Sequence, residues 1–253
     1  MRLERLVPMA VSGLSILFFL GLWQWGSTLV SPLFLPSPEA TFQTASNLLA
    51  KATLVAGIQA SLTRILIGFV IGALAGVALG QAIGNAPFLN AIVGPFVSIF
   101  RFIPTIAVLP LALLWLGPNE PSKIFLVAYS TVFIVTLGTT AAVMNVAIPP
   151  QRAARSLGAS ELQVFLRVIF PSSIPGMVSS SLVALGFAFM VIVTAEMVGS
   201  RSGLGYLISQ GRQLQATGQI FVGIIVLGIA GFILDRLATR ASRVFLGRYG
   251  VKA

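Results

Sequence analysis

Residues 149–175 read PPQRAARSLGASELQVFLRVIFPSSIP and form the most polar internal stretch of an otherwise apolar chain. The two prolines at its start can open a short helix, because the first N–H groups of a helix have no intrahelical partner. Gly158 can end that helix, since glycine adopts the left-handed conformation of a helix C-terminus without strain. Ser160 and Gln163 have the spacing of a capping box, which starts a second helix, and Pro171 is expected to stop it. The stretch therefore predicts a compact helical hairpin between two apolar segments.

The composition around this hairpin is that of a membrane protein. Of the 253 residues 57% are hydrophobic and only 9% are charged, which is typical of a chain that spans a bilayer. There is no cysteine and no histidine, and only six residues are acidic. Disulfide or thiol chemistry is thereby excluded, and an all-protein metal site or a pair of catalytic carboxylates is very hard to build. No metal is expected, and the chain is not expected to be an enzyme.

The chain also lacks a nucleotide-binding loop of its own. Its lysines follow alanine, serine and valine, never glycine, so the pattern GxxxxGK[ST] is absent. If the protein uses ATP, another chain must bind the nucleotide.

The apolar segments predict an all-α membrane protein with six transmembrane helices in a single domain, residues 1–253. Each segment is close to the roughly 20 residues that a bilayer requires. A polar Gly-Asn-Ala-Pro turn separates the second from the third. The six spans are residues 6–30, 59–83, 88–116, 124–144, 173–195 and 219–234. The first apolar run is longer than that of a signal peptide, so it is expected to be retained. Residues 37–51 predict an amphipathic helix outside the membrane, capped by Ser37 and with Glu39 in its first turn.

The basic residues predict the orientation of these spans. Six spans place both termini on one side. Ten of the sixteen basic residues then gather there, against four on the other side. Because positive residues accumulate in the cytoplasm, both ends and residues 149–172 are expected to be cytoplasmic. The same rule accounts for the net charge of +10, so the charge does not indicate nucleic-acid binding.

The second span carries a glycine at every fourth position. This spacing leaves a smooth groove along one face of the helix, where another backbone can approach closely. The five glycines are Gly68, Gly72, Gly76, Gly80 and Gly84. Tight packing against another helix is expected, although the sequence does not say which helix.

Ionisable groups inside spans predict a transport path. Such groups are costly in a bilayer and are usually functional, and Arg64, Arg101 and Glu196 are expected in a similar layer of the membrane. Prolines, among them Pro104, are expected to bend the third span, and bent helices often line transport paths. One hypothesis is that Glu196 pairs with one arginine and leaves a net positive site or gate for an anion. The alternative is that Arg64 extends to the membrane interface and the other two form a structural pair.

The motifs of the hairpin resemble a known signature. RAARSLGAS followed by VIFPSSIPG is similar to the coupling loop of ABC-importer permeases, with Arg152 where the family pattern has glutamate. The stretches SPLFLPSPE near residue 31 and TAEMVGSRSGLGYLI near residue 200 resemble the branch for taurine, other sulfonates and nitrate. The resemblance covers nearly the whole chain.

This resemblance implies a type I importer permease with a coupling helix in the cytoplasm. Two copies of the chain would form the pore in a bacterial inner membrane for a small anion. An ATPase dimer would bind ATP and Mg²⁺ and dock on the loop 149–172, and a separate binding protein would deliver the solute from outside. The residues that the resemblance and the hairpin pattern assign to ATPase coupling are Arg152, Ala153, Ala154, Gly158, Leu162, Phe165 and Pro171.

A second class of function is a self-sufficient carrier or channel driven by an ion gradient. It would need coupling-ion residues near the middle of the membrane and often has an inverted repeat. No clear repeat is visible, and the deep parts of the predicted spans contain no aspartate or histidine.

Overall fold

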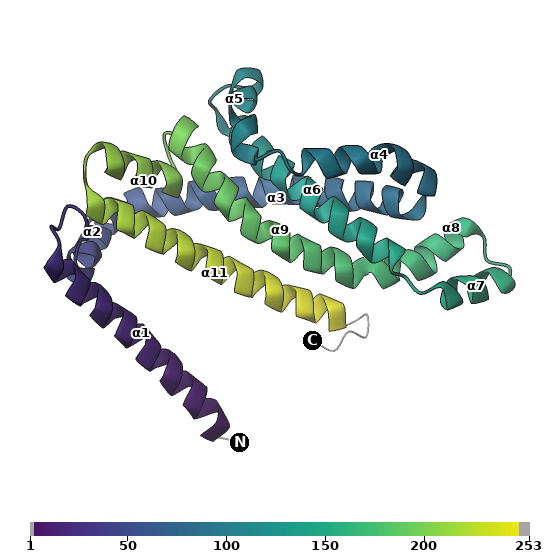
Figure 1. The fold of residues 1–253 in the computed structure, drawn as a ribbon, viewed down its shortest axis with the longest axis horizontal. Helices are drawn as coiled ribbons and strands as arrows, with labels where there is room; N and C mark the ends of the chain where they lie inside the picture. Colours follow the sequence, from purple (N-terminus) through teal and green to yellow (C-terminus); the bar gives the residue numbers. More distant parts are fainter. Residues whose placement is uncertain (1–2, 248–253) are drawn as a thin grey trace.

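The computed structural model describes residues 3–247, whose regular elements are all helices (Figure 1). α1 (Leu3–Leu29) starts away from the end of the molecule where α2 (Pro38–Ala50) and α10 (Leu204–Gln213) lie, and it runs toward that end. α11 (Thr217–Gly247) starts at that end and runs back in the direction of α7 (Figure 1). This arrangement matches the predicted placement of both chain ends on the side of the hairpin, although the membrane sidedness itself stays a prediction. Arg2, Arg248 and Lys252 of the charge argument lie outside the described residues.

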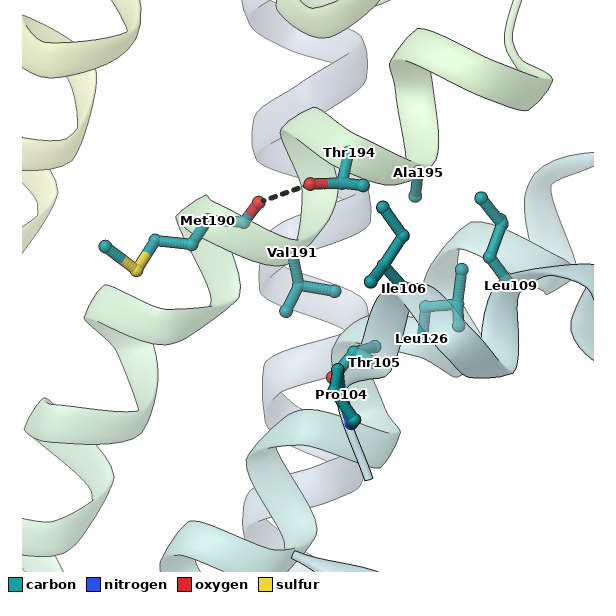
Figure 2. A pocket seen from close by; sticks show the side chains of 9 residues that line it. All are labelled: Pro104, Thr105, Ile106, Leu109, Leu126, Met190, Val191, Thr194 and Ala195. Atoms are coloured by element: carbon teal, nitrogen blue, oxygen red, sulfur yellow. Dashed lines mark hydrogen bonds between the residues drawn. The ribbon is translucent and has the colours of Figure 1, made fainter. Parts of the chain in front are cut away.

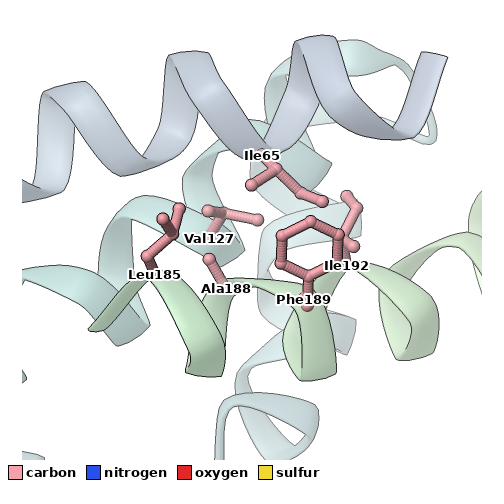
Figure 3. Close-up of a cluster of buried hydrophobic side chains, with 6 residues drawn as sticks. All are labelled: Ile65, Val127, Leu185, Ala188, Phe189 and Ile192. Carbon is pink, nitrogen blue, oxygen red and sulfur yellow. The ribbon is translucent and has the colours of Figure 1, made fainter. Parts of the chain in front are cut away.

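Three long helices form the centre of the molecule. They are α3 (Thr53–Asn85), α6 (Glu120–Met144) and α9, which covers Phe170–Gly199. Figure 3 shows the buried side chains where the three meet, Ile65, Val127, Leu185, Ala188, Phe189 and Ile192. Four of these have no exposed surface, namely Ile65, Val127, Ala188 and Ile192. Burial of this apolar surface fixes the three helices against one another.

The glycine groove of α3 is filled by α6. All five glycines face it, and each lies against a carbonyl group or a Cβ atom of α6. A Cβ atom placed on Gly72 would be 2.6 Å from the carbonyl oxygen of Ala128 and 2.7 Å from the Cβ atom of Thr131. The residues of α6 that they meet also recur at about every fourth position, so two matching faces run the length of the contact. The prediction of close packing is confirmed, and the partner is now identified.

The third predicted span is not one helix. The chain forms α4 (Pro87–Phe100) and α5 (Thr105–Leu116), which meet at 95°. Pro104 causes the break, since it has no N–H and disfavours a helical residue before it. The carbonyl of Phe100, near the freed end of α4, accepts a hydrogen bond from the Tyr129 hydroxyl at 3.2 Å. The other two prolines lie inside α4 and α5 without ending them.

The prediction that Pro171 ends a helix is wrong. After α7 (Ile148–Ser156), the chain forms α8 (Glu161–Val164), a five-residue π-helical turn η1 (Phe165–Ile169) and α9 without interruption. A proline ring normally collides with the carbonyl four residues earlier. Here the N–H of Phe170 donates to the carbonyl of Phe165, five residues back, and the wider turn accommodates the ring. The result is one 39-residue helix, Glu161–Gly199.

Several helices are longer than the predicted spans. α6 begins at Glu120, whereas the sequence suggested a turn as far as residue 123. The chain after residue 195, where the fifth span was predicted to end, was not assigned to a helix. It instead continues α9 to Gly199 and then forms α10, whose side chains Leu204 and Leu207 are buried. The helix predicted in residues 37–51 is present as α2, where the Ser37 hydroxyl accepts the Ala40 N–H at 3.1 Å, and its place outside the membrane stays a prediction.

Four helices of the described part are long and apolar enough to cross a membrane. They are α3, α6, the helix Glu161–Gly199 and α11, and the pair α4–α5 counts as a fifth if it is one broken span. The structure thus has an all-helical, multi-pass architecture. The first predicted span, residues 6–30 in α1, stays a prediction.

Candidate functional site

The first candidate site is the hairpin of residues 149–172, called the knuckle below. α7 ends in a Schellman motif: Gly158 has φ +84° and donates to Arg155, and Ala159 donates to Ala154. These two bonds satisfy carbonyls that a helix end leaves without partners. α8 starts with the predicted capping box, in which Ser160 and Gln163 exchange side-chain to backbone hydrogen bonds of 2.9 and 3.3 Å. Both ends of the turn are therefore fixed by local bonds.

The knuckle presents apolar side chains to the outside. Leu157 is 89% exposed at the tip and Leu162 is 66% exposed on α8. Of the other predicted coupling residues, Arg152 and Ala153 are exposed and Ala154 is partly buried. These two leucines leave apolar surface on an otherwise polar turn, and apolar surface rimmed by polar residues is typical of a binding surface.

Two of the predicted coupling residues, Phe165 and Pro171, do not lie at the exposed tip of the knuckle. Phe165 is only partly exposed and packs edge-to-face on Phe170, with ring centres 6.1 Å apart. Leu157 was not among the predicted coupling residues, because the sequence showed a C-terminal helix residue before a glycine and gave no sign of its exposure. Pro171 lies in the continuous helix behind the knuckle.

An ion pair across the turn stiffens the knuckle. Arg155 of α7 donates through Nε and Nη2 to the two carboxylate oxygens of Glu161, at 2.7 and 3.0 Å. The hydrogen bond to Glu161 raises the pKa of Arg155 above its ordinary value. Both side chains are exposed, and exposed pairs contribute little to stability. The pair links the two short helices across the turn.

The second candidate site is a buried charge cluster around Arg64 of α3, which is 2% exposed. Its guanidinium donates to both carboxylate oxygens of Glu120, at 2.5 and 2.7 Å, and to Glu196 at 2.6 Å. It also donates to the carbonyl and the hydroxyl of Ser202 at 2.8 and 2.7 Å. Every N–H group of the guanidinium therefore has an acceptor. The arginine joins α3 to α6, to α9 and to the loop before α10.

The Glu196 carboxylate also has several hydrogen-bond donors around it. It accepts the Ser61 hydroxyl at 2.8 Å and the Gly205 N–H at 2.9 Å. Gly203 lies against the carboxyl group with φ +114°, and a Cβ atom there would overlap it. These partners compensate the burial of the carboxyl group, which is 1% exposed.

The sequence hypothesis for this cluster is partly correct. Glu196 does pair with an arginine, Arg64, whose side chain is buried. The structure adds Glu120 and Lys123, whose Nζ atom lies 3.4 Å from Glu120. Two cations then meet two carboxylates, so the cluster is balanced and is not a net positive site. Glu120 was missed because it stands in a stretch, PNEPS, that reads as a turn.

The other two path candidates lie apart from this cluster, at the break between α4 and α5. Arg101 is exposed there, and none of the ion pairs among the described residues includes it. Two adjoining cavities of about 540 and 200 Å³ open at the break, and both are lined by Pro104, Thr105 and Val191. Figure 2 shows the smaller one. Of the four predicted path residues, Arg64 and Glu196 thus form a buried ion pair, whereas Arg101 and Pro104 line the larger cavity.

Comparison with known proteins identifies the family. The model of the family described as "Binding-protein-dependent transport system inner membrane component" matches residues 68–245, a range that includes the glycine groove, the break, the knuckle and Glu196. The chain belongs to this family.

Relatives of this permease are similar over most of their length. The taurine transport system permease protein of Escherichia coli K12 is 33% identical over 240 residues, covering 92% of this chain and 86% of the relative. The nitrate import permease protein of Synechocystis is 34% identical over 182 residues, covering 71% and 66%. The predicted resemblance to ABC-importer permeases of the taurine, sulfonate and nitrate branch is confirmed.

A solved structure shares the fold of the permease. A chain of the MetNI methionine ABC transporter, in an inward-facing conformation, matches with a TM-score of 0.69 at 20% identity, covering 76% of this chain and 95% of that chain. This likeness concerns the fold alone. The permease is therefore an all-helical, multi-pass membrane protein with the fold of ABC-importer permeases.

Proposed function

We propose that this permease forms the translocation pathway of an ABC importer for a small anion, with taurine or an alkanesulfonate favoured and nitrate possible. Two copies surround the pathway in a bacterial inner membrane. A dimer of ATPase subunits binds ATP and Mg²⁺ and docks on the knuckles from the cytoplasm. A separate binding protein delivers the solute from the other side.

The observation that carries this proposal is the exposed, doubly capped tip of the knuckle in a member of the importer family. Leu157 and Leu162 stand out beside small residues that let a partner approach closely. Gly158 sets the angle between the helices, and the cap bonds prevent the turn from yielding. A rigid apolar tip is what a docking element needs, because a few buried anchors usually dominate an interface.

The continuous helix Glu161–Gly199 supports coupling over a distance. It carries Leu162 at the knuckle and Glu196 in the charge cluster, 34 residues away in the sequence. At 1.5 Å per residue this corresponds to about 50 Å. A displacement of the knuckle therefore moves the helix that holds the Arg64 pairs, and an element with two arrangements can turn that displacement into opening and closing.

The experiment that tests the proposal compares two leucines of nearly equal exposure. Leu162 is 66% exposed on the knuckle, and Leu214 is 67% exposed between α10 and α11, at the other end of the molecule. The tagged permease would be purified gently from cells that express its neighbouring genes. We expect an ATPase with a nucleotide-binding loop to co-purify with the wild type and with Leu214→Asp, and to be lost with Leu162→Asp.

Two outcomes would contradict the proposal. One is an ATPase that stays bound equally well to both variants, which would remove the knuckle from the interface. The other is a permease that purifies alone and, in liposomes, moves solute without ATP, which would favour the ion-driven carrier.

A further inference from the structure

The two cavities at the α4–α5 break differ in chemistry. The larger, of about 540 Å³, is lined by Arg101, Thr105, Tyr129 and Ser130 together with aromatic and aliphatic side chains. The smaller, of about 200 Å³, has no charged residue in its lining, which is mainly aliphatic and includes Thr105 and Thr194. In Figure 2, Ile106 of α5 and Leu126 of α6 face Val191 of α9 across it. Because the cavities share a wall, a compartment with a charged group lies directly beside a mainly aliphatic one without a charge.

Arg101 is the charged group of the larger cavity. Its guanidinium carbon lies 4.6 Å from the centre of the Phe102 ring, and stacking of this kind orients a guanidinium while leaving its N–H edges open. The Tyr129 hydroxyl already donates to the Phe100 carbonyl, and the Ser130 hydroxyl donates to Val127 at 2.9 Å. The arginine therefore supplies the N–H donors for an anion, in a geometry suited to two parallel bonds.

The lining residues also restrict the rest of the ligand. Neither cavity is lined by an aspartate or glutamate. An ammonium group would be desolvated there without a carboxylate partner, which is unfavourable. A small inorganic anion would leave the apolar compartment unused. An aliphatic body would fill it and gain free energy from the burial of each methylene group.

We propose that the two cavities form one subsite for an organic monoanion with an apolar body, such as an alkanesulfonate, and that Arg101 binds its anionic head. The subsite rests on the proposed import function and narrows it, since a zwitterion such as taurine and a bare anion such as nitrate each match only part of the lining. The positive N-terminal end of α5, at Thr105, adds to the attraction for the head.

Binding of sulfonates to the purified permease in lipid nanodiscs, measured by calorimetry, tests this subsite without ATP. We expect butane-1-sulfonate to bind saturably and Arg101→Gln to weaken it about tenfold or more, because a charge-assisted hydrogen bond is lost. Arg101→Lys should restore part of the affinity. Arg236→Gln is the matched control, because Arg236 is also exposed and also stacks on a phenylalanine, Phe232, at 5.0 Å. It lines neither cavity.

The length of the aliphatic chain tests the apolar compartment. From methanesulfonate to butane-1-sulfonate, affinity should rise roughly fourfold per methylene group while the cavity fills. Ile106→Phe, at a position that lines only the smaller cavity, should flatten this dependence and weaken butane-1-sulfonate binding more than methanesulfonate binding. Taurine and nitrate should bind more weakly than butane-1-sulfonate.

The proposal is overturned if butane-1-sulfonate does not bind saturably, if Arg101→Gln and Arg236→Gln bind it alike, or if taurine binds better. Co-purification of the ATPase, measured on the same preparations, separates this result from the import function. If sulfonate binding fails while the ATPase still co-purifies, only the subsite is refuted. If no ATPase co-purifies, the import function itself is refuted.

Discussion

Replacement of Gly72 by alanine tests the packing of α3 on α6. The new Cβ atom would lie 2.6 Å from the carbonyl oxygen of Ala128. Carbon–oxygen contacts between packed helices are rarely closer than about 3.3 Å, so the helices must separate locally by roughly 0.7 Å. The obstacle is backbone, which no rotamer change can remove. Overpacking of this kind costs about 1–3 kcal/mol.

The control is Gly228→Ala in α11, where a Cβ atom meets nothing within 4 Å. There alanine should stabilise the helix by about 1 kcal/mol through its higher helix propensity. Thermal unfolding of the purified permease, followed by tryptophan fluorescence, measures both. At about 2–4 °C per kcal/mol for a chain of this size, Gly72→Ala should lower the Tm by about 2–12 °C and Gly228→Ala should not lower it. Equal Tm values for the two variants would refute the close-packing argument.

Two other substitutions have clear expected outcomes. Arg64→Met should cost about 3–5 kcal/mol, because it leaves the buried Glu196 carboxylate without its cation. The double variant with Glu196→Met should recover most of that loss in the same thermal assay, and additive losses would contradict the pairing argument. Ser160→Ala should destabilise the start of α8 by about 1 kcal/mol, seen as faster hydrogen exchange at the Gln163 amide. Ser156→Ala, on the exposed end of α7, should leave that exchange unchanged, and an equal effect of the two would count against the capping box.

The features that depend on neighbouring residues could be predicted from the sequence. The knuckle is set by a glycine in the left-handed conformation and by a capping box, both of which act over three to five residues. The glycine spacing of α3 also predicted a groove, because the spacing alone determines which residues share a face. The sequence could not show that α6 fills it, since the complementary face of α6 consists of ordinary valines, alanines and threonines.

The features that depend on distant contacts could not be predicted. Three prolines stand in the third predicted span, and only Pro104 breaks it, where the Phe100 carbonyl accepts hydrogen bonds from the Ile103 N–H and from Tyr129 of another helix. Pro171 looked like a helix stop because the π turn that accommodates it leaves no simple sequence pattern. The Arg64 cluster joins residues 56 and 132 positions apart, and Glu120 entered it only through the fold.

The π turn η1 determines the rotational phase of the long helix behind the knuckle. A π turn is equivalent to one extra residue in an α-helix, and one residue corresponds to about 100° of rotation at 3.6 residues per turn. Deletion of one residue from Phe165–Ile169 would therefore shorten the helix by only about 1.5 Å. It would nevertheless turn the knuckle by more than a quarter of a revolution relative to Glu196. The direction in which Leu162 faces an incoming partner is thus fixed by a single inserted residue.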